Sequence, residues 1–489
     1  MYRVCSRLIF CRTVLVQRVF YSKRVKQRQQ LRDNVDCHVT SDYSWSGKQV
    51  YAFGFAATGA LGIKPAVLPQ ESGNTNRFHA VGYPVKLSSF CKNHSPLAAA
   101  CGYGFTLYLC KNKTSDYGVY GCGLNSDGQL GQLSCIEGQL DTGEPVYAVP
   151  VPTLVPLPLS QTDSADLKPT HIACGRAHSL VGLCSLTSPN VPPIVFGFGN
   201  NAFGQCGREI IEGEVFGPKS CVVSRIVLPK EIRGFKQLCC GQDHSLLLST
   251  DGVVYSAGLG SDGQTGLGHL GVTDRFSPVR GSICDLFVEQ IASRGDTVLA
   301  LTRCGRLFAW GNNEYGQIWT VNDNLQVSEP VELPLDKCSV PSEIRGQLTR
   351  VSIRRPSSIA CAGSMCSLVD EQGHVFVWGF GCLGLGPKVN HAPVPTLIPP
   401  GLFSNASPGT FHRLISVTGG LHHFVVRNAD GLLWAWGAPR GGLHCLGLGS
   451  GLAATSERQT YPMPLSVPAE VVDVACGVDH TILLAKSLA

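Results

Sequence analysis

Residues 240–266 read CGQDHSLLLSTDGVVYSAGLGSDGQTG, and this stretch contains the two elements that decide the fold. The first is Cys-Gly-x-Asp-His at 240–244, which runs directly into an apolar segment. The second is a segment with an aromatic residue that ends at Gly258 and is followed five residues later by Gly263 in a turn. The alternation in 253–256 predicts a half-buried β-strand. The stretch therefore predicts short consecutive strands separated by glycine-containing turns.

Both elements repeat along the chain, which makes self-similarity its dominant feature. The Cys-Gly-x-Asp-His element occurs in seven copies of varying strength, and a strand that contains proline is a third repeated element. The aromatic strand also occurs seven times. Its seven copies end at Gly54, Gly123, Gly199, Gly258, Gly311, Gly379 and Gly437.

Each repeat thus supplies four short strands: the proline-containing strand, the strand that leads into Cys-Gly, the strand after His, and the aromatic strand. Four-stranded sheets repeated around an axis form a β-propeller. The composition agrees, because 56 Gly and 30 Pro without a collagen period are typical of many tight turns. The sequence therefore predicts an all-β protein, a seven-bladed β-propeller with four-stranded blades.

The two ends of the repeat array are incomplete in complementary ways. The last Cys-Gly-x-Asp-His element, at 474–485, has no aromatic strand after it, and the first aromatic strand, at 50–54, has no such element before it. Pairing an N-terminal strand into the C-terminal blade removes two open sheet edges. We therefore expect the ring to close in this way, with residues 48–55 as the outer strand of the seventh blade.

Residues 1–32 differ in charge from the rest of the chain. They hold nine of the 40 Lys and Arg residues and no Asp or Glu, with aliphatic and aromatic residues between the arginines. This composition is typical of a mitochondrial transit peptide, and the aliphatic residues argue against a basic tail or a nuclear signal. The segment 18–22 resembles a matrix-peptidase cleavage site. We predict a transit peptide at 1–32, a linker at 33–47, a propeller at 48–489, and a mitochondrial location in the matrix or at the inner membrane.

From residue 33 onward the chain carries 31 basic residues against 35 acidic ones. A dedicated nucleic-acid-binding protein usually carries its positive charge on the folded domain. We therefore expect no DNA partner. No stretch approaches the roughly 20 uncharged apolar residues of a membrane span, so we also expect no integral membrane segment.

No motif predicts a cofactor, a metal or a catalytic residue. Gly-x-Gly-x-x-Gly occurs from Gly258 and from Gly379, but both copies lie in the turn of the repeat, with no helix to receive a pyrophosphate. No cysteines are spaced as Cys-x-x-Cys, so the 22 cysteines are interpreted as small buried residues of a reducing compartment. Phosphate-binding, metalloprotease and serine-hydrolase motifs are absent. We expect a non-enzymatic protein that acts on partners.

The order Cys-Gly-x-Asp-His-Ser/Thr, strand, aromatic-Gly-x-Asn-x-x-Gly-Gln-Leu-Gly resembles the repeat of the regulator-of-chromosome-condensation family over residues 46–489. Residues 100–107, 373–379 and 474–480 resemble its mitochondrial members in particular. The family's founding member is a chromatin-bound guanine-nucleotide exchange factor, which places a wedge and loops of one propeller face against the phosphate-binding region of a small GTPase. The resemblance thus implies an exchange factor for a GTPase.

For the mitochondrial members, the resemblance implies two alternative functions. One is nucleotide exchange on a mitochondrial, dynamin-type GTPase. The other is a non-catalytic scaffold for large-subunit rRNA processing and ribosome biogenesis. The implied partners are accordingly a mitochondrial GTPase, or mitochondrial ribosome-assembly proteins and rRNA. The long insert at 132–170 is, by its length alone, our candidate for the wedge.

The resemblance also indicates candidate partner-binding residues, because the Asp and His of the Cys-Gly-x-Asp-His element are among the family's functional positions. The residues that match are Asp243, His244, Asp479 and His480. In the other copies, we align the Asp position with Gly104, Ala177, Thr297, Met365 and His422.

Both residue types also have a structural interpretation. A histidine that recurs at one place in successive blades, as His178, His244 and His480 do, is expected to hydrogen-bond backbone between blades. The aspartates either stabilise their turns or present carboxylates that compete for a bound phosphate or its Mg²⁺. The sequence leaves these alternatives open.

Overall fold

The computed structural model describes residues 48–486 with several gaps. The gaps are 64–79, 140–144, 161–162, 164–165, 189–190, 322–323, 336–338, 345–346, 405–411, 440–442 and 450–457. The predicted transit peptide at 1–32 and linker at 33–47 lie outside the described residues.

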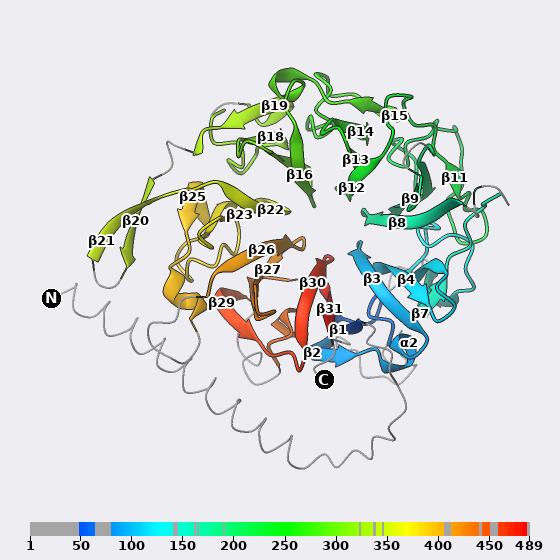
Figure 1. The fold of residues 1–489 in the computed structure, drawn as a ribbon, viewed down its shortest axis with the longest axis horizontal. Helices are drawn as coiled ribbons and strands as arrows, with labels where there is room; N and C mark the ends of the chain where they lie inside the picture. Colours follow the sequence, from blue (N-terminus) through cyan, green and yellow to red (C-terminus); the bar gives the residue numbers. More distant parts are fainter. Residues whose placement is uncertain are drawn as a thin grey trace, which may run out of the picture.

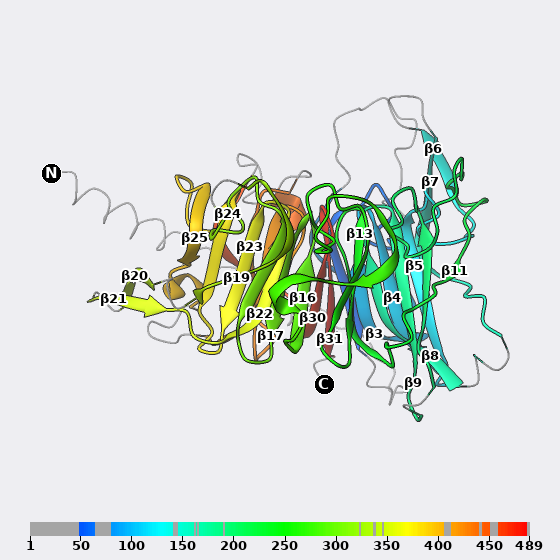
Figure 2. The ribbon, with the colours of Figure 1, turned by 90° about the horizontal axis from the view of Figure 1, so that it is seen from above.

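Seven antiparallel sheets stand around a central axis as the blades of a β-propeller (Figure 1), which confirms the predicted fold. Figure 2 shows the same ring from its rim, with the strands running between its two faces. Blades 1 to 3 contain, in order, β3 (His94–Cys101), β4 (Phe105–Asn112), β5 (Tyr117–Leu124), β7 (Pro145–Leu154) and β6 (Ile136–Gln139); β8 (Leu167–Cys174), β9 (His178–Ser185), β10 (Ile194–Gly199) and β11 (Ser224–Arg225); and β12 (Phe235–Cys240), β13 (His244–Ser249), β14 (Val254–Gly258) and β15 (Thr273–Pro278).

The remaining blades follow the same order from the axis outward. Blades 4 to 7 contain β16 (Val288–Ser293), β17 (Thr297–Thr302), β18 (Leu307–Asn312) and β19 (Gln326–Leu333); β22 (Pro356–Ala362), β23 (Met365–Asp370), β24 (Val375–Phe380) and β25 (His391–Leu397); β26 (Leu414–Gly419), β27 (His423–Asn428), β28 (Leu433–Gly437) and β29 (Gln459–Leu465); and β30 (Glu470–Cys476), β31 (His480–Lys486), β1 (Gln49–Phe55) and β2 (Ala80–Lys86). Short helical turns lie in the connections: α2 (Ser88–Cys91), η2 (Gly281–Ile283), η4 (Pro400–Phe403) and η5 (Leu443–Leu446).

Blade 7 is closed by both ends of the described chain. Strand β1 pairs with β31 from Gln49↔Ala485 to Gly54↔His480, as predicted. The prediction that 48–55 is the outer strand is wrong, because β1 pairs on its other side with β2. The N-terminal part thus contributes two strands rather than one. The exposed edge falls on β2, where Pro84 removes a hydrogen-bond donor.

The hydrophobic core is divided among the junctions between blades. Trp310 of blade 4 and Trp378 of blade 5 are fully buried and share one cluster with residues of blade 3. Each indole Nε1 donates to a carbonyl in the preceding blade: Trp310 to Gln264 at 3.0 Å, and Trp378 to Gln317 at 2.8 Å. The aromatic strands therefore fix how neighbouring blades pack, as well as filling the space between them.

Two segments depart from the four-stranded plan. The insert at 132–170, our candidate wedge, contains β6 and β7, and both belong to the sheet of blade 1. A two-stranded ribbon of β20 (Ser339–Ile344) and β21 (Gln347–Ser352) instead stands outside the blades, between β19 and β22 (Figure 1). The sequence repeats gave no indication of this ribbon, because it lies between two complete repeats.

Within the described ranges, no helix has both the length and the apolar character needed to cross a membrane.

Candidate partner-binding face

Seven turns join the innermost strand of each blade to its second strand and meet around the axis (Figure 1). We call them the central turns, and the end of the ring that carries them the turn face. The central turns comprise residues 101–105, 174–178, 240–244, 293–297, 361–365, 419–423 and 476–480.

One main-chain hydrogen bond identifies equivalent positions in all seven central turns. In each blade, the carbonyl of the residue at the Asp position accepts the N–H that follows the glycine of the aromatic strand. The seven donor–acceptor pairs are Leu124–Gly104, Asn200–Ala177, Leu259–Asp243, Asn312–Asp296, Phe380–Ser364, Ala438–His422 and Phe55–Asp479.

This pattern corrects our alignment in two blades. Thr297 and Met365 begin β17 and β23 and pair with Gly311 and Gly379, as His244 pairs with Gly258. They therefore occupy the His position, and the Asp position of blade 4 is held by Asp296. The error came from anchoring the motif on Gly295 and Gly363. These glycines lie one residue later in their turns than Gly241 does.

The repeated histidines join neighbouring blades. Each ring is fully buried, and its Nε2 contacts a hydroxyl of the following blade. Burial lowers the pKa of each to about 3, so the rings are neutral. The pairs are His178–Ser245 at 2.9 Å, His244–Ser293 at 3.2 Å, His423–Thr481 at 3.0 Å and His480–Thr106 at 3.0 Å.

The expected inter-blade role is therefore observed, with hydroxyl partners in place of the predicted backbone partners. In the 178–245 pair, the serine hydroxyl also contacts the backbone, because it donates to the carbonyl of Gln205 at 2.6 Å. Glycine is required below each ring, since a Cβ at Gly241 would lie 2.0 Å from Cε1 of His244. His244 and His480 are thus enclosed by protein and do not present a surface to a partner.

Asp243 is also largely buried. Only 8% of its side chain is exposed, and Oδ2 lies 2.7 Å from Nη2 of Arg176, whose own side chain is 48% exposed. Among the described residues, Oδ1 is buried without a hydrogen-bond partner. Burial raises the pKa of Asp243, and the Arg176 charge opposes that shift. The arginine was not predicted from the sequence, although it occupies the x position of a Cys-Gly-x-x-His element.

Asp296 lies in the next turn and is held by amides instead of a cation. Gln242 Nε2 donates to its Oδ2 at 2.9 Å, and Gln264 Nε2 donates to Oδ1 at 3.4 Å. Burial first, and then the negative charges of Asp262 and Asp243, raise its pKa to about 6. Three turns are linked in sequence here, because Arg176 N–H also donates to Gln242 O and Gln242 N–H donates to Gly295 O.

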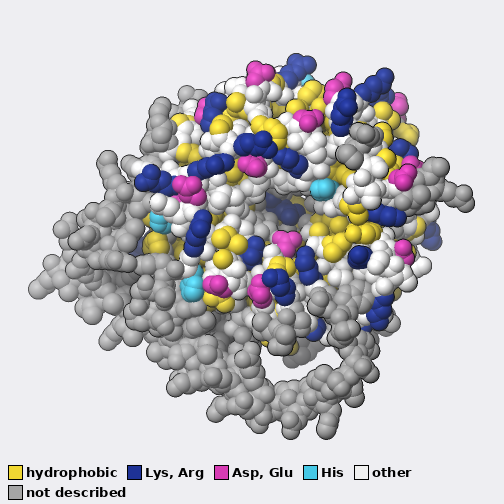
Figure 3. Space-filling view, in the orientation of Figure 1, with side chains coloured by type: hydrophobic (Ala, Val, Ile, Leu, Met, Phe, Trp, Pro, Cys, Tyr) yellow, Lys and Arg dark blue, Asp and Glu magenta, His cyan; other side chains and the backbone are white. Residues whose placement is uncertain are grey.

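Arg294 crosses the centre of the ring. Its guanidinium donates from Nη1 to the carbonyl of Cys101 at 2.7 Å and from Nη2 to the carbonyl of Cys476 at 2.5 Å. Tyr103 Oη in turn donates to the Arg294 carbonyl at 3.4 Å. Blade 4 is thus tied to blades 1 and 7 across the axis. Figure 3 shows the hollow at the centre of the ring, with basic side-chain atoms inside it.

The structure does not bring the four predicted site residues together. Asp243 and His244 lie in blade 3, whereas Asp479 and His480 lie in blade 7, on the other side of the ring (Figure 1). The Asp479 side chain is partly exposed, and its carbonyl accepts from Phe55 N–H at 2.7 Å. The residues gathered around Asp243 are instead Arg176, Gln242 and Asp296.

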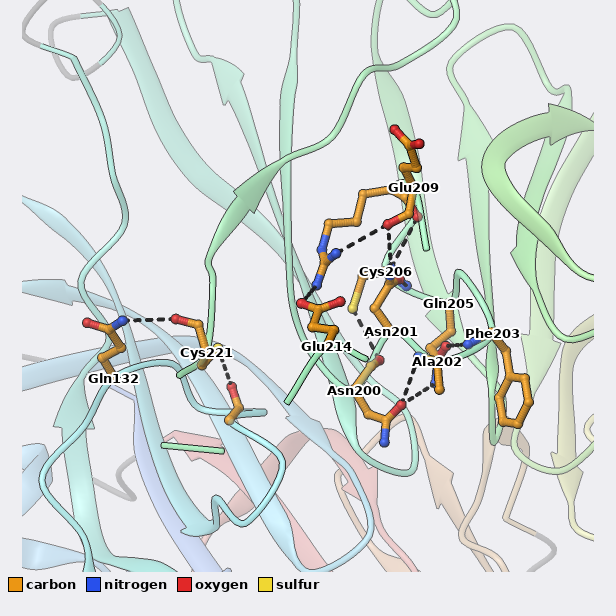
Figure 4. A network of polar contacts seen from close by, with 12 residues as sticks. Gln132, Asn200, Asn201, Ala202, Phe203, Gln205, Cys206, Glu209, Glu214 and Cys221 are labelled. Atoms are coloured by element: carbon orange, nitrogen blue, oxygen red, sulfur yellow. Dashed lines mark hydrogen bonds and ion pairs between the residues drawn. The ribbon is translucent and has the colours of Figure 1, made fainter. Parts of the chain in front are cut away.

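A loop of blade 2, residues 200–223, begins at the turn face where β10 ends, and the Gln205 carbonyl in it accepts from Ser245 of blade 3. Figure 4 shows polar contacts of this loop. Arg208 and Glu214 form an ion pair in it with side chains only 13% and 15% exposed. Asn201 Nδ2 donates to the carbonyls of Arg208 at 3.2 Å and Glu209 at 3.1 Å. The loop is therefore held in one conformation while Ile211 and Val215 are 59% and 72% exposed.

A groove of about 540 Å³ lies next to this loop. It is bounded by Gln132–Cys135, Glu137 and Tyr147 of blade 1 and by Pro218 and Lys219 of blade 2. Gln132 Nε2 joins the two sides by donating to the carbonyl of Cys221 at 2.9 Å (Figure 4).

Among the described residues, no group of three or more His, Cys, Asp or Glu side chains is placed to hold a metal ion. The described cysteines are free thiols, most of them buried, in agreement with their interpretation as small buried residues. The turn face presents a half-exposed guanidinium, with carboxylates and amides fixed around the axis and apolar side chains at the rim.

Comparisons with known proteins agree with this architecture. A family model described as "Regulator of chromosome condensation (RCC1) repeat" matches residues 118–181, 194–248 and 430–484, and a second model of that description matches 235–264 and 288–317. The mouse "RCC1-like G exchanging factor-like protein" is 39% identical over 447 residues, which cover 90% of this chain and 87% of the mouse protein. Its human counterpart is 38% identical over 446 residues, with the same coverage.

Solved structures show the same fold. The crystal structure of human WBSCR16 superposes with a TM-score of 0.73 at 37% identity, covering 91% of this chain and all of that one. Yeast RCC1 (Prp20), solved bound to Kap60, superposes with a TM-score of 0.65 over 91% of this chain and 90% of that one. At 20% identity, this second likeness concerns the fold alone.

Proposed function

The chain belongs to the family of RCC1-like G exchanging factor-like proteins, and from that premise we propose that it is a guanine-nucleotide exchange factor for a mitochondrial GTPase of the dynamin type. The observation that supports this most is the cluster of Arg176, Asp243, Gln242 and Asp296 on the turn face. An exchange factor has no substrate pocket of its own. It needs a rigid surface that binds the GTPase better without nucleotide than with it.

The turn face has the rigidity that such a surface needs. Its polar groups are fixed by contacts between blades, so little conformational freedom is lost when a partner binds. The aliphatic side chains of Ile211 and Val215 lie in the same blade as Arg176 and provide apolar area next to the polar centre. We propose that a GTPase covers both regions and is held in its nucleotide-free state.

We further propose that the protein acts inside mitochondria after removal of a transit peptide within residues 1–32. The support is the acid-free, arginine-containing composition of that segment. A variant that lacks 1–32 should fail to enter mitochondria in an import assay. Normal import of that variant would overturn the proposed location.

The exchange activity is tested by release of a fluorescent GDP analogue from candidate mitochondrial GTPases, with residues 33–489 added in catalytic amounts. We expect accelerated release from at least one of them. Ile211→Arg should reduce the acceleration at least tenfold, because it places a charge where apolar contact is proposed.

Leu186→Arg is the matched control. Leu186 lies in the same blade and is 57% exposed, but it follows β9 at the opposite face of the ring. This variant should release GDP at the wild-type rate. If the wild-type protein accelerates release from no mitochondrial GTPase, exchange is excluded, and scaffolding of mitochondrial ribosome assembly becomes the better proposal.

A further inference from the structure

We propose that Arg176, and not Asp243, is the residue of the turn face that contacts the partner, and that it takes an anionic group there, a carboxylate or a phosphate. In this proposal, Asp243 and Gln242 are positioning residues that aim the guanidinium. The inference rests on the proposed function and identifies the recognising group of that site.

Exposure separates the two members of the ion pair. The Asp243 side chain is 8% exposed, whereas that of Arg176 is 48% exposed. A carboxylate covered to that extent cannot reach a partner without a change in its turn. That turn is fixed, because the Asp243 carbonyl accepts from Leu259 N–H at 2.9 Å, and a Cβ at Gly258 would lie 2.5 Å from that oxygen.

By the residues that the structure describes, the guanidinium is held at one end only. Nη2 contacts Asp243 Oδ2 at 2.7 Å, and the main chain of Arg176 is fixed separately, through its N–H to Gln242 O at 3.0 Å. An arginine has five N–H donors in a planar fork. The remaining donors of this half-exposed side chain therefore stay available for a second anion.

The surroundings favour an arginine that orients an anion over one that only stabilises the fold. Within the described part of the chain, Asp243 Oδ1 is buried without a partner, which is a costly arrangement for a purely structural ion pair. The neighbouring Asp296 is occupied by the amides of Gln242 and Gln264, so it does not draw the guanidinium away from its position.

The experiment compares Arg176→Ala and Asp243→Asn with a matched pair elsewhere in blade 2. Arg225 and Asp163 also form an ion pair between a half-exposed arginine, 56% exposed, and a more buried aspartate, 21% exposed. Arg176→Ala should lower kcat/KM for GDP release at least tenfold, whereas Arg225→Ala should leave it unchanged.

A positioning role predicts a specific pattern for Asp243. Asp243→Asn should lower kcat/KM less than Arg176→Ala does, and the double variant should be no worse than Arg176→Ala alone, because Asp243 acts only through the arginine. If Asp243→Asn lowers exchange in a background that already lacks Arg176, the carboxylate contacts the partner itself and the proposal is wrong. If Arg176→Ala exchanges nucleotide like the wild-type protein, the proposal is equally wrong.

Two arms distinguish the sources of the anion. Binding of the nucleotide-free GTPase, measured by surface plasmon resonance, should weaken in Arg176→Ala if the anion is a protein carboxylate. It should remain unchanged, with only the GDP-bound complex affected, if the anion is a phosphate. If Arg176→Ala weakens neither the nucleotide-free nor the GDP-bound complex, the inference is overturned. Failure of the proposed function is a separate result, since the wild-type protein itself would then accelerate GDP release from no GTPase.

Discussion

The central turns of blades 3 and 4 occupy equivalent positions, but different residues hold each turn to the rest of the ring. In blade 3, 240–244 reads Cys-Gly-Gln-Asp-His, and its histidine bridges to blade 4. In blade 4, 293–297 reads Ser-Arg-Gly-Asp-Thr, and Thr297 Oγ1 donates to Asn312 O within its own blade at 2.7 Å. Blade 4 compensates through Arg294, which reaches across the axis. Position in the blade, rather than residue identity, is thus what the repeat conserves within this chain.

The largest expected difference between the two turns is in their response to acid. The folded-state pKa of about 3 for His178, His244, His423 and His480 lies below the usual 6.5. Below pH 6.5 the unfolded chain therefore binds more protons than the folded chain, and the free energy of unfolding decreases as the pH decreases. Each buried histidine should cost about 2 kcal/mol of unfolding free energy at pH 5 relative to pH 7. Urea unfolding followed by circular dichroism at pH 7, 6 and 5 measures this loss.

A pair of variants locates the effect. His244→Gln should reduce the slope of unfolding free energy against pH by about 1 kcal/mol per pH unit averaged over pH 5–7, because the variant lacks the proton that the unfolded wild-type chain takes up there. Thr297→Ala, at the equivalent position of blade 4, should leave the slope unchanged. Equal slopes for His244→Gln and the wild-type protein would show that the ring is not the buried neutral group described above.

The second expected effect concerns Arg294 of blade 4, which among the seven central turns described is the residue that reaches across the axis. Arg294→Met removes two charge-assisted hydrogen bonds and leaves the carbonyls of Cys101 and Cys476 to find other donors. We expect a loss of about 2–4 kcal/mol of unfolding free energy. Differential scanning calorimetry should show a lower Tm for Arg294→Met and an unchanged one for Arg233→Met, whose arginine is exposed in the connection before β12. Equal Tm values for the two variants would exclude a clamp across the axis.

The third expected effect concerns the carboxylate of Asp296. Burial raises the folded-state pKa of Asp296 to about 6, so the folded protein binds the extra proton, and stability falls as pH rises from 4 through 6. Asp296→Asn should lack that fall. Its free energy of unfolding, relative to that of the wild-type protein, should therefore increase by on the order of 1–3 kcal/mol from pH 4 to pH 7. The measurement is the wild-type minus variant difference in unfolding free energy at each pH. A difference that does not change with pH would contradict the raised pKa.

Much of this fold follows from the sequence, because a propeller repeats its local chemistry once per blade. The glycines and aromatic strands predicted seven blades and the closure between the chain ends. The outer strand β2 was missed as part of blade 7, since its proline-containing element was counted with the following repeat. The ribbon β20–β21 was missed because it occurs once, and a feature that does not repeat leaves no periodic signal.

The candidate site was predicted less well than the fold. Spacing would have found Asp296, because in blades 3 to 6 the Asp position lies fifteen residues before the glycine that ends the aromatic strand, as in Asp243–Gly258 and Asp296–Gly311. The Arg176–Asp243 pair joins residues 67 positions apart in different blades. Such a pair depends on how two turns meet at the axis, and the sequence of one repeat contains no information about that meeting.

The smallest effect, and the one that tests the comparison most directly, is the coupling within each polar pair. Arg176–Asp243 and Gln242–Asp296 hold equivalent aspartates, one through a half-exposed cation and the other through a neutral amide. Double-mutant cycles with Arg176→Ala and Asp243→Asn should give a coupling of about 1 kcal/mol that shrinks between 0.05 and 0.5 M salt, because mobile ions screen a partly exposed ion pair. The cycle with Gln242→Ala and Asp296→Asn should give about 0.5–1 kcal/mol with little salt dependence, since the amide carries no net charge. Equal salt dependence in the two cycles would mean that the Arg176 guanidinium does not form a stable ion pair with Asp243, and the distinction between the turns of blades 3 and 4 would then rest on His244 and Arg294.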